Sequence, residues 1–252
     1  ERFPDAELFT LIHRPGSVAR VIENRRIHTS FVQRLPLAGR YYRHYLPLFP
    51  TAIERFRFDR FDAVLSLSHC AAKSVVTPPG VPHVCYCFTP MRYAWDQFDA
   101  YFGPQRLGTL GSAVMRPIMA RMARWDRATA DRPSRYVAIS HYVAGRIRRY
   151  YNREAAVLYP PVQTDFYHPG PAPGAHALIV SALVPYKRIE LAMAACDAAG
   201  VPLTIVGDGP ERPALERAAS PRITFLGRLS DDDVRDQYQR AGVVLLPGEE
   251  DF

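Results

Sequence analysis

The sequence predicts an α/β fold with two parallel sheets, because short apolar runs alternate along the chain with segments of helical periodicity. A stretch rich in proline and glycine near the middle (159–174, YPPVQTDFYHPGPAPG) suits neither a helix nor a central strand. The chain has 252 residues, 48% of them hydrophobic, which is enough for two domains with their own cores. We therefore expect an N-terminal domain at 1–160, a linker at 161–174 and a C-terminal domain at 175–252.

The first half predicts one parallel sheet and two prominent helices. Its strands are expected at four apolar runs, namely 6–12, 63–68, 83–88 and 136–140. Residues 141–151 predict the helix that follows the last strand. Between 106 and 131, methionine and isoleucine recur at helical spacing while most arginines fall on other faces, which predicts an amphipathic helix (Met115, Ile118, Met119 and Met122; Arg116, Arg121, Arg124 and Arg127).

The second half alternates more regularly and predicts a doubly wound α/β domain. Four strands are expected, at 177–183, 202–207, 223–227 and 243–247, the last of them buried. Three helices are expected between them, at 187–200, around 211–219 and at 230–242. Gly200 suits the residue that closes the first of these helices, and Ser230 suits the N-cap of the third.

The composition restricts the classes of function. No run of about 18 apolar residues predicts a membrane span. The four cysteines form no CxxC pair, so we expect free thiols in a cytoplasmic protein. Residues 1–170 carry 24 Lys and Arg against 13 Asp and Glu, whereas residues 171–252 carry 8 against 12. This asymmetry predicts a basic first half that faces an anionic surface or ligand.

Ligands of open α/β sheets bind beyond the carboxyl ends of the strands, so the residues there are the candidates for function. Lys187 and Arg188 follow the first strand of the second half, at a helix start where backbone N–H groups also favour a phosphate. Gly207 and Gly209 follow the next strand and permit close approach of a ligand. An exposed basic turn and an ordinary glycine turn remain the alternatives. The carboxylates of 249–251 follow the last strand and are either sugar ligands or a solvated tail.

Seven segments carry a resemblance that covers nearly the whole chain. The second half contains SALVPYKR, IVGDGPE, FLGRLSDDDV and LLPGEEDF in that order. The first half contains SHCAAKSV, HVCYCFTPMRYAWD and ISHYVAGRIRRYYNREAAVLYPPVQTDFYHP. Together they resemble glycosyltransferase family 4, retaining enzymes of the GT-B fold, and within it the mannosyltransferase-like subgroup that builds bacterial surface polysaccharides. The resemblance implies two Rossmann-like domains, both incomplete in this chain.

The resemblance also implies the roles of individual residues. Lys187 corresponds to the family's diphosphate-binding lysine, and Glu250 to the glutamate beside the donor sugar. Arg188, Gly207, Gly209 and Gly227 are the further substrate-binding residues expected in the second half. The arginine that usually precedes the lysine is Ala182 here, and a usual histidine is Phe88, for which His69 is the candidate substitute. No metal, cofactor or protein nucleophile is expected, because the leaving phosphate is thought to assist front-face attack.

For the first half, the resemblance places acceptor or donor sugar binding at the loop that contains Phe88, Arg92 and Asp96. A loop packed by its own aromatic residues is the alternative. The expected partners are a GDP-sugar or UDP-sugar and a lipid-linked or glycan acceptor. The arginines of 116–127 and the cluster RYYRHYLPLF (40–49) mix cations with aromatic rings, which is typical of surfaces that contact anionic lipid. We expect a cytoplasmic protein, peripheral on the inner face of the bacterial plasma membrane.

Three hypotheses of function follow. The first is transfer of a hexose, with mannose favoured, from a nucleoside-diphosphate sugar during surface polysaccharide synthesis. The second is an impaired fragment or relative that only binds nucleotide, which Ala182 and Phe88 favour. The third is a nucleic-acid-binding protein, which the pI near 9.4 suggests and the net charge of −4 over residues 171–252 disfavours. The chain starts without Met and lacks the family's second glutamate, so we expect an internal piece of a longer enzyme.

Overall fold

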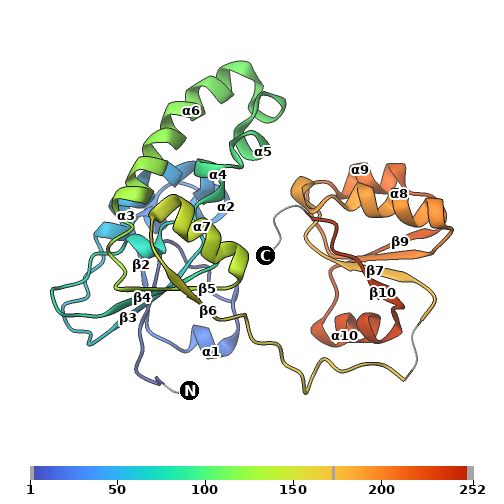
Figure 1. Ribbon diagram of the computed structural model, residues 1–252, viewed down its shortest axis with the longest axis horizontal. Coiled ribbons are helices and arrows are strands. Elements are labelled where there is room, and N and C mark those ends of the chain that lie inside the picture. Colours follow the sequence, from blue (N-terminus) through green and yellow to red (C-terminus); the bar gives the residue numbers. More distant parts are fainter. Residues whose placement is uncertain (1–2, 172–173, 249–252) are drawn as a thin grey trace. The chain divides into compact units, whose positions relative to one another are not determined.

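The computed structural model describes residues 3–171 and 174–248, and the chain forms two compact units (Figure 1). The first unit ends at Tyr159 and the second begins at Pro160. Each unit contains a parallel sheet covered by helices, which confirms the predicted α/β class with two Rossmann-like units. We describe each unit by itself.

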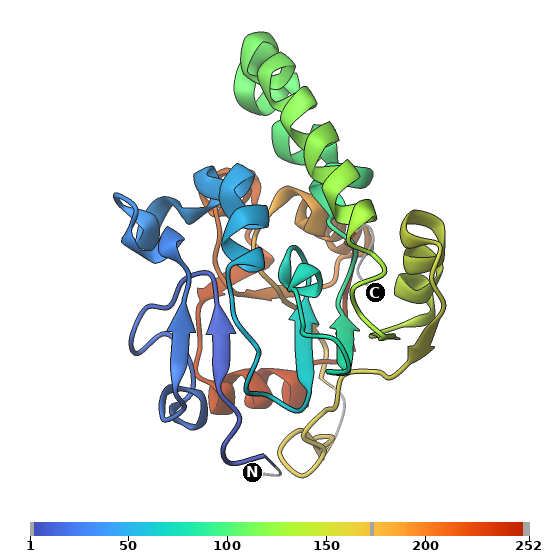
Figure 2. The same ribbon diagram turned by 90° about the vertical axis from the view of Figure 1, so that its left-hand side faces the viewer.

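The first unit contains two parallel sheets. Its strands are β1 (Leu8–Thr10), β2 (Ile27–Thr29), β3 (Val64–Ser68), β4 (His83–Cys87), β5 (Arg135–Ala138) and β6 (Ala155–Val157). β1 pairs with β2, and the other four form a sheet in the order β3-β4-β5-β6. All these pairs are parallel, so the carboxyl ends of neighbouring strands lie at one edge (Figure 2). β2 and β6 were not predicted, because three residues are too few for a recognisable apolar run.

The helices of the first unit are α1 (Arg20–Glu23), α2 (Ala38–Tyr41), α3 (Phe49–Glu54), α4 (Arg92–Trp95), α5 (Phe98–Phe102), α6 (Pro104–Ala128) and α7 (His141–Tyr151). Four 3₁₀ helices occur in the chain, η1 (Phe31–Arg34), η2 (Tyr42–Leu48) and η3 (Ala72–Ser74) in this unit and η4 (Pro185–Lys187) in the second, as far as the described residues show. The amphipathic helix predicted over 106–131 is α6. Met119 and Met122 are buried in the core beneath it, with Met115 and Ile118 packed against that core.

The second unit is a doubly wound α/β domain, in which helices cover both faces of one parallel sheet. The sheet has the order β10-β7-β8-β9, built from β7 (Ala177–Val180), β8 (Leu203–Val206), β9 (Ile223–Gly227) and β10 (Val243–Val244). The helices α8 (Ile189–Ala199) and α9 (Arg212–Ala218) cover one face, and α10 (Asp231–Arg240) covers the other (Figure 1). Gly200 takes a φ of 68° directly after α8, and the Ser230 hydroxyl accepts a hydrogen bond from the Asp233 N–H at 3.2 Å. Both predicted helix ends are therefore confirmed.

The last predicted strand differs from its expectation. Only Val243 and Val244 are paired, with β7, and their exposed fractions are 49% and 41%. Within the described residues β10 lies at the edge of its sheet, so its side chains lack a neighbouring strand. Leu245 continues the contact, because its N–H donates to the Leu178 carbonyl at 2.8 Å and its side chain packs against the core. The prediction of a buried strand over 243–247 is therefore wrong for these residues.

A buried ion pair organises the core of the first unit. Lys73, in η3, places its ammonium 3.1 Å from the Asp126 Oδ1 atom of α6, and both residues are fully buried. The same ammonium donates to the Asp126 carbonyl at 2.6 Å and to the Thr129 hydroxyl at 3.0 Å. The Asp126 Oδ2 atom accepts from Trp95 at 2.8 Å and from Tyr151 at 2.9 Å. One carboxylate thus connects η3, α4, α6 and α7.

His83, the first residue of β4, is buried, and its role is structural. Its side chain lies 2.8 Å from the Ser66 hydroxyl of the neighbouring strand β3. Burial, which removes water from the charged form, lowers the pKa of His83 from 6.5 to about 4. The folded protein therefore holds this imidazole neutral.

We expect Lys73→Met to destabilise the first unit by about 3–5 kcal/mol, because it leaves the Asp126 carboxylate buried without a counter-charge. The double variant Lys73→Met/Asp126→Leu should recover part of this loss. Both tryptophans lie in the first unit, so urea unfolding followed by tryptophan fluorescence reports on it alone. The matched control is Arg148→Met, which breaks the exposed pair with Glu154 and should cost far less stability, because water screens this pair. Equal losses for the two single variants would contradict the role of the buried pair.

We expect His83 to make the first unit less stable in acid. The unfolded chain binds a proton at this residue near pH 6.5 and the folded chain only near pH 4, so protonation favours unfolding between these values. The stabilisation is present in full above pH 6.5 and is lost as the pH falls through about 4, and it amounts to about 3 kcal/mol. His83→Gln should remove this part of the pH dependence of urea unfolding. An unaltered pH profile in His83→Gln would contradict the assignment.

Candidate functional site

The carboxyl edge of the second sheet is closed by backbone hydrogen bonds between the loops that follow β7, β8 and β9. The Leu183 N–H donates to the Asp208 carbonyl at 3.0 Å, and the Glu211 N–H donates to the Leu183 carbonyl at 3.1 Å. The Gly207 N–H donates to the Gly227 carbonyl at 2.7 Å. These bonds fix three consecutive strand ends relative to one another, and they bring together the predicted residues Gly207, Gly209 and Gly227.

The two glycines after β8 are required by this packing. A Cβ atom at Gly207 would lie 1.9 Å from the Ser181 carbonyl oxygen, and Gly207 also has a φ of 127°. A Cβ atom at Gly209 would lie 2.3 Å from the Leu183 carbonyl oxygen. Both distances are far shorter than a van der Waals contact, so only glycine fits. The contacts within the chain account for both glycines, and their predicted contact with a ligand stays a prediction.

The predicted cations lie at the start of α8. Lys187 ends η4, half-buried, with its ammonium 5.6 Å from the centre of the Tyr186 ring. Arg188 is the N-cap residue, and no side chain caps the helix there. Arg188 has a φ of 50°, a conformation in which residues other than glycine are strained and which is often found at functional sites. Its guanidinium contacts Glu190 at 2.8 Å, which offsets the unfavourable charge at this helix end.

Arg212 is a third basic residue near this edge, and the sequence did not single it out. It is the first residue of α9, and its Nη1 atom lies 4.0 Å from Asp208. A Cβ atom at Gly227 would lie 3.0 Å from the same Nη1 atom, so the guanidinium lies against the end of β9. Its Nε atom also contacts Glu216 at 2.7 Å. Its position directly after the GDGPE segment was the signal that could have identified it.

Glu250, the residue predicted to lie beside the donor sugar, falls outside the described residues, as do its neighbours in 249–252. Ala182, at the position of the family's usual arginine, is exposed.

His69 and Phe88 lie side by side at the carboxyl edge of the first sheet. They follow the paired residues Ser68 and Cys87 of β3 and β4, and the Phe88 N–H donates to the Ser68 carbonyl at 2.8 Å. His69 is exposed, whereas Phe88 packs against the core. The structure therefore places His69 next to the position where relatives are expected to carry histidine.

His69 lies among positive charges. Desolvation lowers its pKa below 6.5, and the charges of Arg92 and Arg43 lower it further. The imidazole is accordingly neutral at neutral pH and presents a nitrogen that accepts a proton or a hydrogen bond. Arg92 begins α4 and is half-buried. Because its charge acts on the His69 imidazole, we treat the two side chains as one small basic site.

Asp96, in contrast, is engaged by its own unit. Arg146 of α7 forms a two-pronged ion pair with it, through Nη1 to Oδ2 and through Nη2 to Oδ1, the latter at 3.0 Å. The Tyr150 hydroxyl donates to the same carboxylate at 2.8 Å. Trp95 stacks on the Tyr150 ring at 4.7 Å. These contacts support the alternative of a loop packed by its own side chains, and the predicted substrate contact of Asp96 remains untested.

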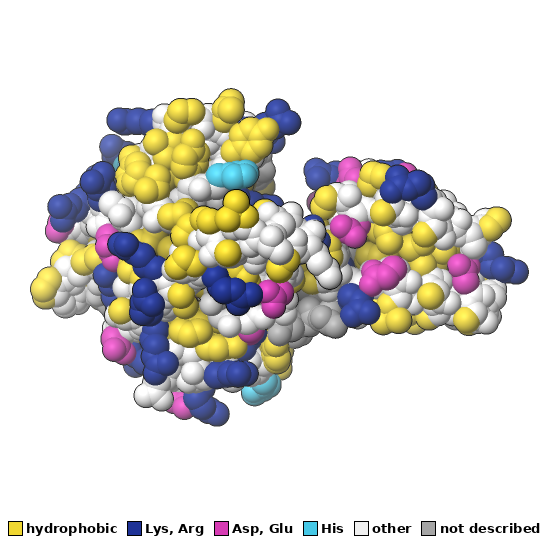
Figure 3. Space-filling model, turned by 90° about the horizontal axis from the view of Figure 1, so that it is seen from above, with side chains coloured by type: hydrophobic (Ala, Val, Ile, Leu, Met, Phe, Trp, Pro, Cys, Tyr) yellow, Lys and Arg dark blue, Asp and Glu magenta, His cyan; other side chains and the backbone are white. Residues whose placement is uncertain are grey.

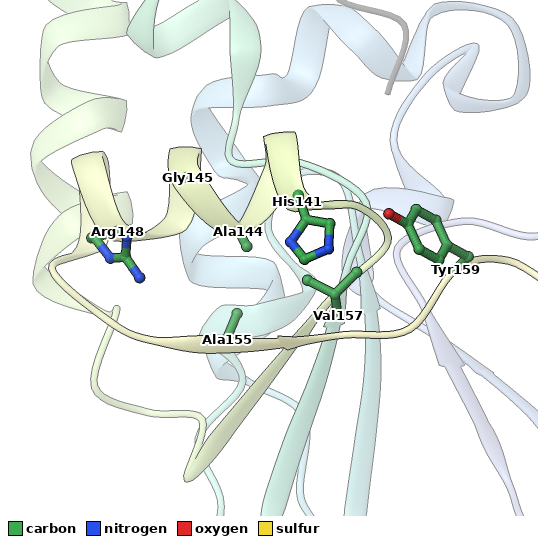
Figure 4. A pocket seen from close by; sticks show the side chains of 7 residues that line it. All are labelled: His141, Ala144, Gly145, Arg148, Ala155, Val157 and Tyr159. Carbon is green, nitrogen blue, oxygen red and sulfur yellow. The ribbon is translucent and has the colours of Figure 1, made fainter.

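A cavity of about 520 Å³ lies between α7 and β6 in the first unit (Figure 4). The rings of His141 and Tyr159 lie at one end of it, with their centres 6.2 Å apart, and Arg148 lies at the other end. The side chain of His141, the first residue of α7, is exposed in this cavity. The wall between the two ends is formed by the small residues Ala144, Gly145 and Ala155. Their side chains are too short to fill the space, which is why a cavity remains.

In the described part of the chain, neither the cysteine thiols nor the side chains that could bind a metal form a further candidate site. All four cysteines are free, as predicted, and three are buried. The partly buried Cys70 lies 2.6 Å from the Tyr93 hydroxyl, and burial raises the pKa of its thiol to about 12. Over residues 3–171 and 174–248, no group of three or more His, Cys, Asp or Glu side chains is arranged to hold a metal ion. No helix in the same part of the chain is long and apolar enough to cross a membrane.

We expect Gly209→Ala to destabilise the second unit by roughly 1–3 kcal/mol, because the added methyl group meets the Leu183 carbonyl oxygen of the neighbouring loop. The measurement is hydrogen–deuterium exchange of peptides from 177–227, which should lose protection. Gly145→Ala is the control, because a Cβ atom there meets nothing within 4 Å and helical alanine is favoured over glycine. Unchanged exchange in Gly209→Ala would show that the loops do not pack as described.

The chain is similar to a family of known proteins and to a solved structure. No curated protein sequence matches it. Among solved structures, the chain is similar to a variant of TarM from S. aureus crystallised with fondaparinux, α-GlcNAc-glycerol and UDP, with 11% sequence identity and a TM-score of 0.46. That similarity covers 79% of this chain and 39% of TarM, so the chain spans well under half the length of the structure it matches. Residues 175–252, which correspond to the second sheet and its loops, match the model of the family of glycosyl transferases group 1.

Proposed function

We propose that this chain is part of a retaining glycosyltransferase that moves a hexose, with mannose favoured, from a nucleoside-diphosphate sugar to a lipid-linked or glycan acceptor. The match of residues 175–252 to glycosyl transferases group 1 is the observation that carries this proposal. Surface polysaccharide synthesis on the cytoplasmic side of a bacterial plasma membrane is the proposed setting.

In this proposal the second unit binds the donor. The diphosphate lies near Lys187 and the uncapped start of α8, where cations and backbone N–H groups favour an anion. As the bond to the sugar breaks, negative charge develops on the leaving phosphate, and a fixed cation lowers the energy of that state. Lys187 is therefore assigned to stabilise the leaving group, with Arg188 and Arg212 as further basic residues on the same edge. Glu250 is assigned to the donor sugar.

The first unit is assigned to the acceptor. His69 is neutral at neutral pH, because desolvation and two arginines keep its pKa low. A neutral imidazole can accept the hydrogen of a sugar hydroxyl, and Arg92 beside it can bind an anionic group. A hydroxyl and a phosphate are the two groups that a lipid-linked diphosphate sugar presents. No protein nucleophile is proposed, because the leaving phosphate can itself take the acceptor proton.

A relative that only binds nucleotide is the second candidate. Two observations favour it, the exposed Ala182 in place of an arginine and the packing of Phe88 into the core. Such a protein would bind the nucleoside diphosphate at the same edge of the second sheet without turning over the donor.

We expect Lys187→Ala to weaken nucleoside-diphosphate binding at least tenfold, because a charge-assisted contact to phosphate contributes roughly 1.5–3 kcal/mol. The measurement is isothermal titration of the 252-residue chain with GDP, UDP and GDP-mannose. Arg217→Ala, an exposed arginine of α9 outside the loops at the carboxyl edge, is the matched control and should bind as the unchanged chain does.

Binding by none of the three nucleotides would contradict both candidates for this chain. Binding that is equally strong in Lys187→Ala would retain a nucleotide site but remove the assignment of the diphosphate to the start of α8. Hydrolysis or transfer of the sugar from GDP-mannose distinguishes the transferase from the relative that only binds nucleotide.

A further inference from the structure

The outward face of α6 carries apolar side chains that the core does not use. Leu110 is 79% exposed and Val114 is 55% exposed, and Leu107 is exposed on the preceding turn. Figure 2 shows α6 projecting past the carboxyl ends of the strands of the first unit. Hydrophobic side chains gather on the upper face of that unit, with Lys and Arg side chains beside them (Figure 3). Grouped exposed residues of this kind indicate a contact surface more than scattered ones do.

The packing of α6 does not explain this face. The opposite side of the helix supplies Met119, Met122 and Asp126 to the core. Helical spacing places Leu110, Val114, Pro117, Arg121 and Arg124 together on the outward side, at intervals of three or four residues. We call these five residues the outer stripe of α6.

The outer stripe changes from apolar to basic along its length. Arg121 and Arg124 are exposed, and so is Arg106 on the first turn of the helix. Within the described part of the chain, none of these three arginines forms an ion pair with another residue. The only acidic side chain of α6 is Asp126, which is buried against Lys73. The outward face of the helix therefore carries positive charge only.

We propose that the outer stripe of α6 docks the first unit on an anionic lipid bilayer. Leu110 and Val114 enter the boundary between head groups and acyl chains, while Arg121 and Arg124 contact lipid phosphates. Tyr101 of α5, whose side chain is 37% exposed beside α6, supplies an aromatic ring of the kind that resides at that boundary.

Charge distinguishes the bilayer from other occupants. Two copies joined through the same face would place the arginines either against each other or against the apolar end of the partner's stripe, and neither arrangement supplies a counter-charge. A nucleic acid would contact the arginines but would leave Leu110 and Val114 exposed. An anionic bilayer can bury the apolar end of the outer stripe and neutralise the charge of its basic end.

This surface consists of residues of the first unit, whereas the proposed donor site consists of residues of the second. Docking would bring the first unit to the place where a lipid-linked acceptor resides. The surface is tested without nucleotide, and failure of one proposal leaves the other intact.

The test is co-sedimentation of the 252-residue chain with vesicles of phosphatidylcholine alone and of phosphatidylcholine mixed equally with phosphatidylglycerol. We expect strong binding to the mixed vesicles only, weakened by added salt. Leu110→Ser/Val114→Ser should lower the partition coefficient at least about tenfold, because two apolar side chains no longer insert. Arg121→Gln/Arg124→Gln should lower it by about fivefold for each arginine, on anionic vesicles alone.

The matched controls lie on exposed helix faces of the second unit. They are Leu191→Ser, whose leucine is 52% exposed on α8, and Arg217→Gln on α9. All variants change exposed side chains, and circular dichroism verifies that they fold. Absent binding to anionic vesicles, or equal losses in the controls, would overturn the proposal. A concentration-dependent dimer in sedimentation velocity that Leu110→Ser/Val114→Ser abolishes would instead assign the surface to a second copy.

Discussion

The carboxylate of Asp126 is the point on which the first unit depends. It lies in the interior beside the Lys73 ammonium and accepts hydrogen bonds from Trp95 and Tyr151, so one acidic group connects α6 to η3, α4 and α7. Burying two charges is costly, and attraction between them compensates only when further hydrogen bonds satisfy the remaining polar atoms. The network meets this condition for the ammonium, which donates to Ser74, Thr129 and the Asp126 carbonyl, and for Oδ2, whereas Oδ1 has only the ion pair with Lys73. It also fixes η3, which follows the loop that contains His69 and Cys70, and the end of α4, three residues after Arg92. The basic site around His69 is therefore positioned by a buried network a few residues away.

The second unit positions its candidate site by a different means. Its carboxyl edge has no comparable buried ion pair among the described residues, and backbone hydrogen bonds connect the loops instead. Such bonds need the loops to approach closely, which is why Gly207 and Gly209 lie against the carbonyl groups of Ser181 and Leu183. The cations are then left at the surface of a rigid edge, on η4 and at the start of α8. A rigid backbone with half-exposed cations can bind an anion without rearrangement. The conformational entropy of the loops is already lost during folding, so binding does not have to order them.

Local signals explain what the sequence could predict. Gly200, Ser230 and the helix over 141–151 were placed correctly, because helix ends depend on neighbouring residues. Contacts between distant residues were not predicted. Lys73 and Asp126 are separated by 53 positions, and Asp96 meets Arg146 across 50, and no short motif encodes either pair. For the same reason the sequence favoured Asp96 as a ligand and could not show its engagement with α7.

The glycines were found by their pattern, but their close contacts with the neighbouring loop became evident only in the structure. The last strand was expected to be buried because its residues are apolar, and burial depends on neighbours that the pattern does not reveal.

The two faces of α6 link the core of the first unit to its surface. Asp126, in the last turn of α6, lies inside the ion-pair network, which fixes the direction in which α6 leaves the core. Met119 and Met122 continue that contact on the inward side. The left-handed Gly108, with a φ of 70°, interrupts the helix near its projecting end, so the residues before it follow a different direction from the rest. Because folding is satisfied by the inward face, the apolar residues of the outer stripe add nothing to the stability of the isolated unit, and their exposure to water is a cost. A partner that buries Leu110 and Val114 and accepts the charge of Arg121 and Arg124 removes this cost. Since the helix is held at its buried end, such a partner would contact a preformed surface and would not have to order it.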